Sequence, residues 1–439
     1  MSAEFGLSSA IVDIKEAWKA LLIMSAVSFV ITIIYIFLLR WITKPLLYTS
    51  LLLIFVLGLL VGYFVWTKKD EYPAESNNYK YAMALAIVVW VITALYALFV
   101  CCQWGNIALG ASIMEASGDF VSKNTRVGLM PLIAYIVTIP ITLWWGASAV
   151  YIYSIGEPSY EENTMIAKIN LGQEATYMFW VFLFGLFWIV AFVIALSQFI
   201  IATTACMWYF SGDGSDSHDG DGNYGVLMAT KWGFSYHMGS VAFGAFLIAV
   251  ITMIKVIFEY FAKKYESVAG KDNFVFKAVT CCIRCCIWAL DSYIKFINEN
   301  AYIQIALHNS SFCKAAQESF YLMIRHAGRF SSVGVVGWIM TFLGKGVIVG
   351  LSMWLTILLV EQSYTQVQQP IVPAVLVGIV AWVIASLFLS IFDYSSLAIL
   401  HCFIVDQDFG GSAKTPDSLK NFLDFNDEQV AKKNKVNPK

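Results

Sequence analysis

Ionisable side chains inside long apolar runs are the first places where this sequence could carry out chemistry. A charge in the hydrocarbon region of a membrane is costly, so it usually pairs with another group or lines a path for a polar solute. Lys345 lies in the middle of an apolar run. Pairing with Glu259 or with helix-end carbonyls would make it structural, and lining a pathway would make it functional. His237 could shuttle protons or reach the interface, Glu361 lies at a span end, and Asp393 is expected to meet cytoplasmic headgroups.

Three further patterns do not predict a metal or nucleotide site. The cysteines at 281, 282, 285 and 286 spread over one face of a helix, so they cannot surround a zinc ion, and palmitoylation or inert packing fits better. The Asp-rich loop at 212–225 lacks the glycine and glutamate of an EF-hand. The sequence contains no Gly-x4-Gly-Lys-Ser/Thr motif, so ATP-driven pumping by this chain is not expected. No cofactor is implied.

The composition is that of a membrane protein. Of 439 residues, 59% are hydrophobic and only 13% are charged, whereas roughly 25% of the residues of a soluble domain are charged. The formal net charge of −2 gives no basic field for nucleic acid, which is therefore not an expected partner. An enzyme acting on lipid headgroups is not expected either, because no cluster of His, Asp and Glu lies inside the membrane boundary.

Eight apolar stretches are long enough to cross a membrane. Because lipid requires backbone groups to be satisfied within the segment, stretches of this length are helical. The expected fold class is an all-α polytopic transmembrane helix bundle with eight spans plus one semi-polar crossing. The eight stretches are 20–39, 45–67, 81–114, 127–156, 175–212, 238–254, 330–360 and 370–392.

The additional crossing follows from the loop charges. Basic loops mark the cytoplasmic side, which places the loops after the first and third spans inside and the N-terminus outside. With eight crossings, the basic stretch after the sixth span falls outside, although Arg325 and Arg329 favour the inside. A crossing by the semi-polar segment 275–297 removes this conflict and places the C-terminus inside. A surface-lying helix there, with a re-entrant element elsewhere, is the alternative.

The remaining expectations concern packing and domain limits. Gly58-x3-Gly62 and Gly346-x3-Gly350 have the spacing of close helix packing. The spacing of apolar residues after Asn300 predicts a pair of amphipathic helices on the cytoplasmic face. The expected division is an interfacial segment at 1–19, a transmembrane domain at 20–404 that includes these helices at about 300–330, and a polar tail at 405–439.

Several strings in the second half of the chain resemble the choline transporter-like family of solute carriers. They include YHMGSVAFG at 236–244, CCIRCCIW at 281–288, NAYI at 300–303 and FLGK at 342–345. The resemblance covers roughly residues 15–411. It implies ten spans and a cytoplasmic N-terminus in the family, and transport of choline or ethanolamine without ATP hydrolysis.

A quaternary ammonium substrate, implied by the resemblance, suggests which residues would bind it. Aromatic faces attract such a cation through the ring quadrupole, and a polar group is needed for the choline hydroxyl. Packing or membrane-belt roles stay open as the alternative for each aromatic residue. The predicted substrate-binding residues are Trp188, Gln198, Trp208, Tyr209, Tyr236 and His237, with Glu259 and Lys345 as ion-pair or pathway residues.

The resemblance leaves a second function open. Family members begin with a first span and a large glycosylated outer loop, whereas this chain starts where the second span of the family would start. The alternative is therefore a transporter-derived subunit of a larger membrane complex that no longer transports. Expected partners are choline or a similar amine, membrane lipids and, under the alternative, other subunits. The plasma membrane and the mitochondrial inner membrane are not distinguished.

Overall fold

The computed structural model divides into two compact units, one formed by Met1–Lys123 with His326–Lys439 and the other by Asn124–Arg325. We call them unit 1 and unit 2. The interfacial segment expected at 1–19 and the polar tail expected at 405–439 lie mostly outside the described residues. The structure describes residues 14–69, 73, 76–160, 167–170, 172–211, 223–269, 274–363, 367, 369–410, 415–416 and 419–420.

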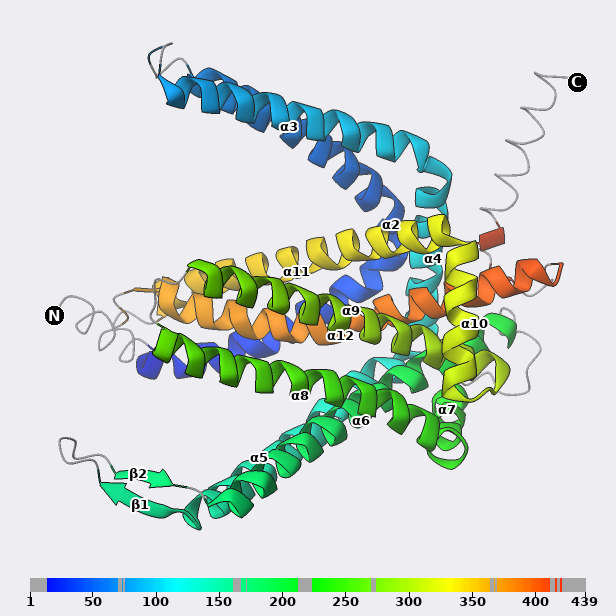
Figure 1. Ribbon diagram of the computed structural model, residues 1–439. Helices are drawn as coiled ribbons and strands as arrows, with labels where there is room; N and C mark the ends of the chain where they lie inside the picture. The colour runs from blue at the N-terminus through cyan, green and yellow to red at the C-terminus, as the bar shows by residue number, and fades with distance from the viewer. Residues whose placement is uncertain are drawn as a thin grey trace, which may run out of the picture. The chain divides into compact units, whose positions relative to one another are not determined.

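Unit 1 begins with a long bent helix that contains two spans. Helix α2 (Trp18–Lys68) is 51 residues long, and its halves Trp18–Leu39 and Trp41–Lys68 are each apolar enough to cross a membrane. Figure 1 shows that α2 bends between these halves. Pro45 lies near this junction, and a proline inside a helix removes one backbone hydrogen bond and crowds the preceding turn. The short first loop that we expected is therefore a bend within one helix.

The third expected span, at 81–114, is too long. Helix α3 (Asn77–Cys102) ends within this range. Helix α4 (Trp104–Lys123) then starts in a new direction (Figure 1). Most of α4 is buried, and it packs on α2, α11 and α12. Its Gly, Ala and Ser side chains permit this close contact. Hydropathy could not reveal the break, because both helices are uncharged over the predicted range.

Two helices complete unit 1. They are α11 (Ala327–Ser363) and α12 (Ile371–Asp408), which pack on each other and on α2 and α4. The prediction for Gly58 and Gly62 is confirmed, because both face side chains of α3. The prediction for Gly346 and Gly350 is wrong, because open space faces both. Gly344 makes the close contact in α11 instead.

Unit 2 consists mainly of helices, with one small hairpin. Helix α7 (Asn223–Ser235) begins within the Asp-rich loop expected at 212–225, most of which lies outside the described residues. Strands β1 and β2 form an antiparallel pair between α5 and α6. The elements are η2 (Thr125–Leu129), α5 (Met130–Ser154), β1 (Glu157–Tyr160), β2 (Ala167–Asn170), α6 (Gln173–Ser211), α7 (Asn223–Ser235), α8 (Met238–Ala269), α9 (Phe274–His308) and α10 (Phe312–Arg325).

The structure contains the eight expected spans and supports the ninth. Among the described residues, eight helical segments are long and apolar enough to cross a membrane, and α9 is not one of them. With 35 residues, α9 is nevertheless about 52 Å long. It packs against α6 and α8 and runs antiparallel to α8 (Figure 1). This arrangement favours the nine-crossing interpretation over a helix lying on the membrane surface.

The prediction of two amphipathic helices at about 300–330 is correct for only one of the two helices. Its first half is not a separate helix, because α9 continues to His308. The second half is α10, which packs on α8 and α9. Asn309 joins the two helices with φ +51°, a left-handed conformation that asparagine tolerates better than most residues.

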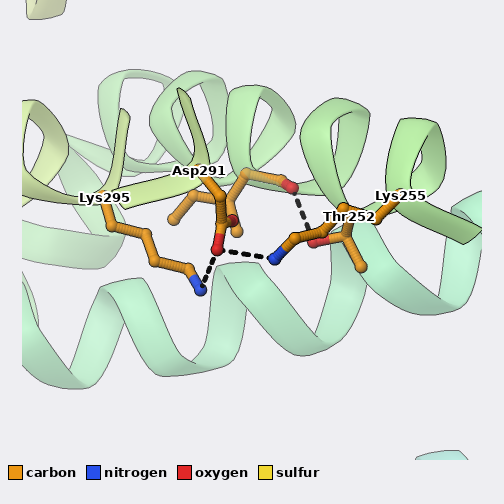
Figure 2. A network of polar contacts seen from close by, with 5 residues as sticks. Thr252, Lys255, Asp291 and Lys295 are labelled. Carbon is orange, nitrogen blue, oxygen red and sulfur yellow. Dashed lines mark hydrogen bonds and ion pairs between the residues drawn. The ribbon is translucent and has the colours of Figure 1, made fainter. Parts of the chain in front are cut away.

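Two charged residues of α9, Arg284 and Asp291, are paired with charged residues of α8. The carboxylate of Glu259 accepts two hydrogen bonds from Arg284, at 2.6 and 2.8 Å. Near the middle of both helices, one oxygen of Asp291 accepts hydrogen bonds from Lys255 at 2.6 Å and from Lys295 at 2.9 Å. Figure 2 shows the two ammonium groups meeting the same carboxylate oxygen. Charged groups inside a membrane need such partners, so α8 makes a crossing by α9 possible.

A test of the glycine contact uses two positions in one turn of α11. A Cβ at Gly344 would lie 2.6 Å from Cε1 of Tyr35, whereas a Cβ at Gly346 would meet nothing within 4 Å. Gly344→Ala should destabilise the purified protein by about 1–3 kcal/mol through overpacking. Gly346→Ala should be neutral or stabilising by up to about 1 kcal/mol. Unfolding midpoints in detergent measure both, and equal shifts would contradict the contact.

A second test compares the two ion-paired carboxylates. The Asp291 side chain is 8% exposed and its two lysines are 34% and 49% exposed, so Asp291→Asn removes their shared counter-charge and should cost about 1–3 kcal/mol of stability. The side chains of Glu259 and Arg284 are 41% and 50% exposed, so Glu259→Gln should cost less than about 1 kcal/mol. Denaturation of both purified variants measures the difference. A loss for Glu259→Gln as large as for Asp291→Asn would refute this ranking.

Candidate functional site

The predicted substrate-binding residues on α6 do not form one pocket. Trp188, Gln198, Trp208 and Tyr209 all lie on this helix. At 1.5 Å per residue, Trp188 and Tyr209 are about 31 Å apart along the helix axis. A trimethylammonium group is only a few ångströms across, so it cannot contact all of these side chains at once. The aromatic residues of α6 therefore lie at different heights along this helix and cannot all belong to one binding pocket.

Trp188 connects α6 to α8. Its indole N–H donates a hydrogen bond of 3.0 Å to the carbonyl oxygen of Ala242. Its ring meets the edge of Phe246 with centroids 5.6 Å apart, and Phe184 lies against both rings. The Trp188 side chain is still partly exposed. The indole N–H of Trp188 is thus already hydrogen-bonded within the fold, and part of its ring surface stays accessible.

The middle of α6 lies close to the start of α8. Gln198 is half-buried, and its neighbour Phe199 packs on the ring of His237 with centroids 5.4 Å apart. Partial burial lowers the pKa of His237 below its ordinary value, so the imidazole is neutral at pH 7. His237 comes directly before α8. The structure thus brings the segment of Gln198 and Phe199 close to His237, at a different level from Trp188.

The other aromatic predictions differ in exposure. Tyr209 is fully buried and packs on Phe210, with ring centroids 5.0 Å apart. Trp208 is half-buried, and Tyr236 is 72% exposed at the end of α7. Tyr209 is therefore a core residue, whereas Trp208 and Tyr236 have surface that a solute or a lipid can reach.

Of the two predicted ion-pair or pathway residues, Glu259 pairs with Arg284 rather than with Lys345. In unit 1, the ammonium group of Lys345 lies 5.4 Å from the centroid of the Trp382 ring, a cation–π contact between α11 and α12. Sequence analysis missed Lys255 because the expected sixth span ended at residue 254, one residue before it.

Asp393 lies in an unexpected environment. It was expected to meet headgroups, but its carboxylate is turned toward α11, where Oδ1 accepts a hydrogen bond of 3.0 Å from the Thr341 hydroxyl. A Cβ built on Gly337 would lie 3.6 Å from the same oxygen and 3.9 Å from the sulfur of Met114. Asp393 therefore lies close to both α11 and α4, 15 residues before the end of α12.

Similar proteins identify the kind of molecule to which these features belong. The chain matches the plasma-membrane choline transporter family over residues 87–408. It is 24% identical to choline transporter-like protein 2 of Dictyostelium discoideum, over 94% of this chain and 67% of that protein. Choline transporter-like protein 3 of Bos taurus is 29% identical over 93% of this chain, and that of Homo sapiens is 28% identical over 91%.

The chain spans 63% and 61% of the length of the latter two relatives. The family match nevertheless covers most of this chain, including all of unit 2 and helices α4, α11 and α12. It agrees with the eight apolar spans. The protein is therefore a multi-pass integral membrane protein that belongs to the choline transporter family.

Proposed function

We propose that this protein carries choline, or a related amine such as ethanolamine, across a membrane without hydrolysing ATP. The observation that carries the proposal is the match over more than nine-tenths of the chain to relatives that are named choline transporter-like proteins. The absence of a nucleotide-binding motif from the sequence supports transport driven by gradients. The proposal is a transport step with no enzymatic reaction.

Among the predicted substrate-binding residues, we propose that the accessible ones contact choline one after another as it crosses the membrane. A quaternary ammonium keeps its charge throughout the crossing, so it benefits from aromatic faces at successive depths. Trp188, Trp208 and Tyr236 retain exposed ring surface at different levels of unit 2. Gln198 offers an amide for the choline hydroxyl, and neutral His237 lies near its level. Full burial of Tyr209 favours a packing role for that residue.

Uptake into proteoliposomes tests the proposed activity. The purified full-length protein should take up radiolabelled choline in a saturable manner, and unlabelled choline and ethanolamine should compete. Addition of ATP should leave the rate unchanged. Empty liposomes and liposomes with heat-denatured protein are the controls. Uptake no greater than in these controls would contradict transport and would favour a subunit that no longer transports.

Two substitutions on α6 separate a pathway role from a packing role. Gln198→Leu keeps the size of the side chain and removes the amide, so it should lower choline uptake by about tenfold, the loss expected when one good polar contact is removed. Trp188→Phe keeps an aromatic face but removes the hydrogen bond to Ala242, so it should lower the unfolding midpoint and leave the KM for choline within about twofold. Unchanged uptake by a well-folded Gln198→Leu protein would remove this residue from the proposed path.

A further inference from the structure

Asp393 has a different kind of partner from Glu115, Glu259 and Asp291. Glu115 pairs with Lys44 at 2.7 Å, Glu259 with Arg284, and Asp291 with two lysines. In the described parts of the chain, no basic side chain lies within 4.0 Å of the Asp393 carboxylate. Its side-chain partner there is the hydroxyl of Thr341. This carboxylate therefore has an orienting hydrogen bond but no ion-pair partner.

Lys345 of α11 is a lysine near Thr341, but its ammonium group contacts Trp382. Lys345 comes one turn after Thr341, so its side chain starts close to Asp393. Its ammonium group lies over the Trp382 ring and makes no ion pair with Asp393. Trp382 comes 11 residues before Asp393 in α12, about 16 Å along the helix. The contact with the ring thus leaves the lysine without a direct ion pair to the carboxylate, although its charge still acts on Asp393 at longer range.

The surroundings of Asp393 suit a cation without N–H groups. Gly337 presents no side chain toward Oδ1, and a Cβ built there would lie within 3.9 Å of the Met114 sulfur as well as 3.6 Å from Oδ1. The Asp393 residue keeps exposed surface, although its carboxyl group is largely surrounded by protein. Methyl groups of a trimethylammonium can contact a glycine backbone, a thioether and the threonine methyl. Because they donate no conventional hydrogen bonds, such a cation needs a counter-charge more than a set of acceptors.

We propose that Asp393 is the counter-ion for the quaternary ammonium group of the substrate, at a site formed by Thr341, Gly337 and Met114 in unit 1. The inference rests on the proposed transport of choline and adds the residue that recognises its charge. Thr341 positions the carboxylate by donating to Oδ1, which leaves Oδ2 for the cation. The Lys345–Trp382 contact keeps the lysine from taking that place.

Binding to the purified full-length protein in detergent tests the site. Three probes are used: choline, tetramethylammonium, and the neutral isostere of choline in which a tert-butyl group replaces trimethylammonium. Asp393→Asn should weaken binding of both cations by about tenfold or more, because it removes a charge–charge attraction. Binding of the neutral isostere should change by less than about twofold. Asp393→Glu should restore part of the affinity for both cations.

The matched control is Glu259→Gln, which removes a carboxylate that already has a cation. It should leave the affinity for choline within about twofold. Thr341→Val, which is nearly isosteric, should weaken cation binding by about threefold through loss of the orienting hydrogen bond. This variant also tests the site if Asp393→Asn fails to elute as a folded protein on size exclusion.

The outcomes separate this inference from the proposed function. Wild-type protein that transports choline, with Asp393→Asn or Thr341→Val binding both cations as tightly as wild type, would overturn the site and leave transport intact. Equal weakening for the neutral isostere would also overturn it, because it indicates a general structural loss. Binding of tetramethylammonium that depends on Asp393, without any uptake of choline, would support the site and contradict the transport proposal.

Discussion

Charge pairing between α8 and α9 is the constraint on which the architecture of unit 2 depends. Helix α9 is too polar to count as a span by its own composition, and its charges face a helix that carries complementary groups. Lys255 and Glu259 lie one turn apart on α8 and meet Asp291 and Arg284 of α9. Without these partners, α9 would place charged groups in lipid. With them, its 35 residues run beside α8 across the same thickness.

Asp393 differs from the ion-paired carboxylates of both units, and this difference has a functional meaning under our proposals. In unit 2, Glu259 of α8 and Asp291 of α9 are paired with arginine or lysine, as Glu115 is in unit 1, so these three carboxylates stabilise the fold. In unit 1, Asp393 has a hydrogen bond but no cation among the described residues, while Lys345 is held by an aromatic ring. A carboxylate left without a cation in a membrane helix is more costly than a paired one. Such a cost is usually retained where function requires it.

Much of the fold could be predicted from the sequence because membranes impose simple rules. The eight spans follow from length and hydropathy, and the charge conflict around Arg325 predicted the additional crossing before any geometry was known. The break at Gln103 could not be predicted, because a change of helix direction between two apolar segments leaves no charge signal. The close contact of Gly344 was missed for a similar reason. Its partner, Tyr35, lies on a helix far away in sequence.

The site was harder to predict than the fold. Aromatic residues on α6 are suitable by type, but helix geometry spreads Trp188 and Tyr209 over about 31 Å. Residue types alone could not show that Trp188 uses its N–H to bind α8, or that Tyr209 is fully buried. Asp393 was recognised as an ionisable residue at the end of a span, and its contact with headgroups stays a prediction. Its orientation toward Thr341 depends on how α11 and α12 pack, which one sequence does not encode in any local pattern.

The crossing by α9 can be measured directly by labelling lysines from one side of a sealed membrane. Lys264 lies near the end of α8, before α9, and Lys314 lies in α10, after it, and both are exposed. A membrane-impermeant amine reagent, followed by peptide mass spectrometry, should modify one of them in intact vesicles and the other only after permeabilisation. Modification of both lysines from the same side of intact vesicles would contradict a crossing by α9 and the pairing that permits it.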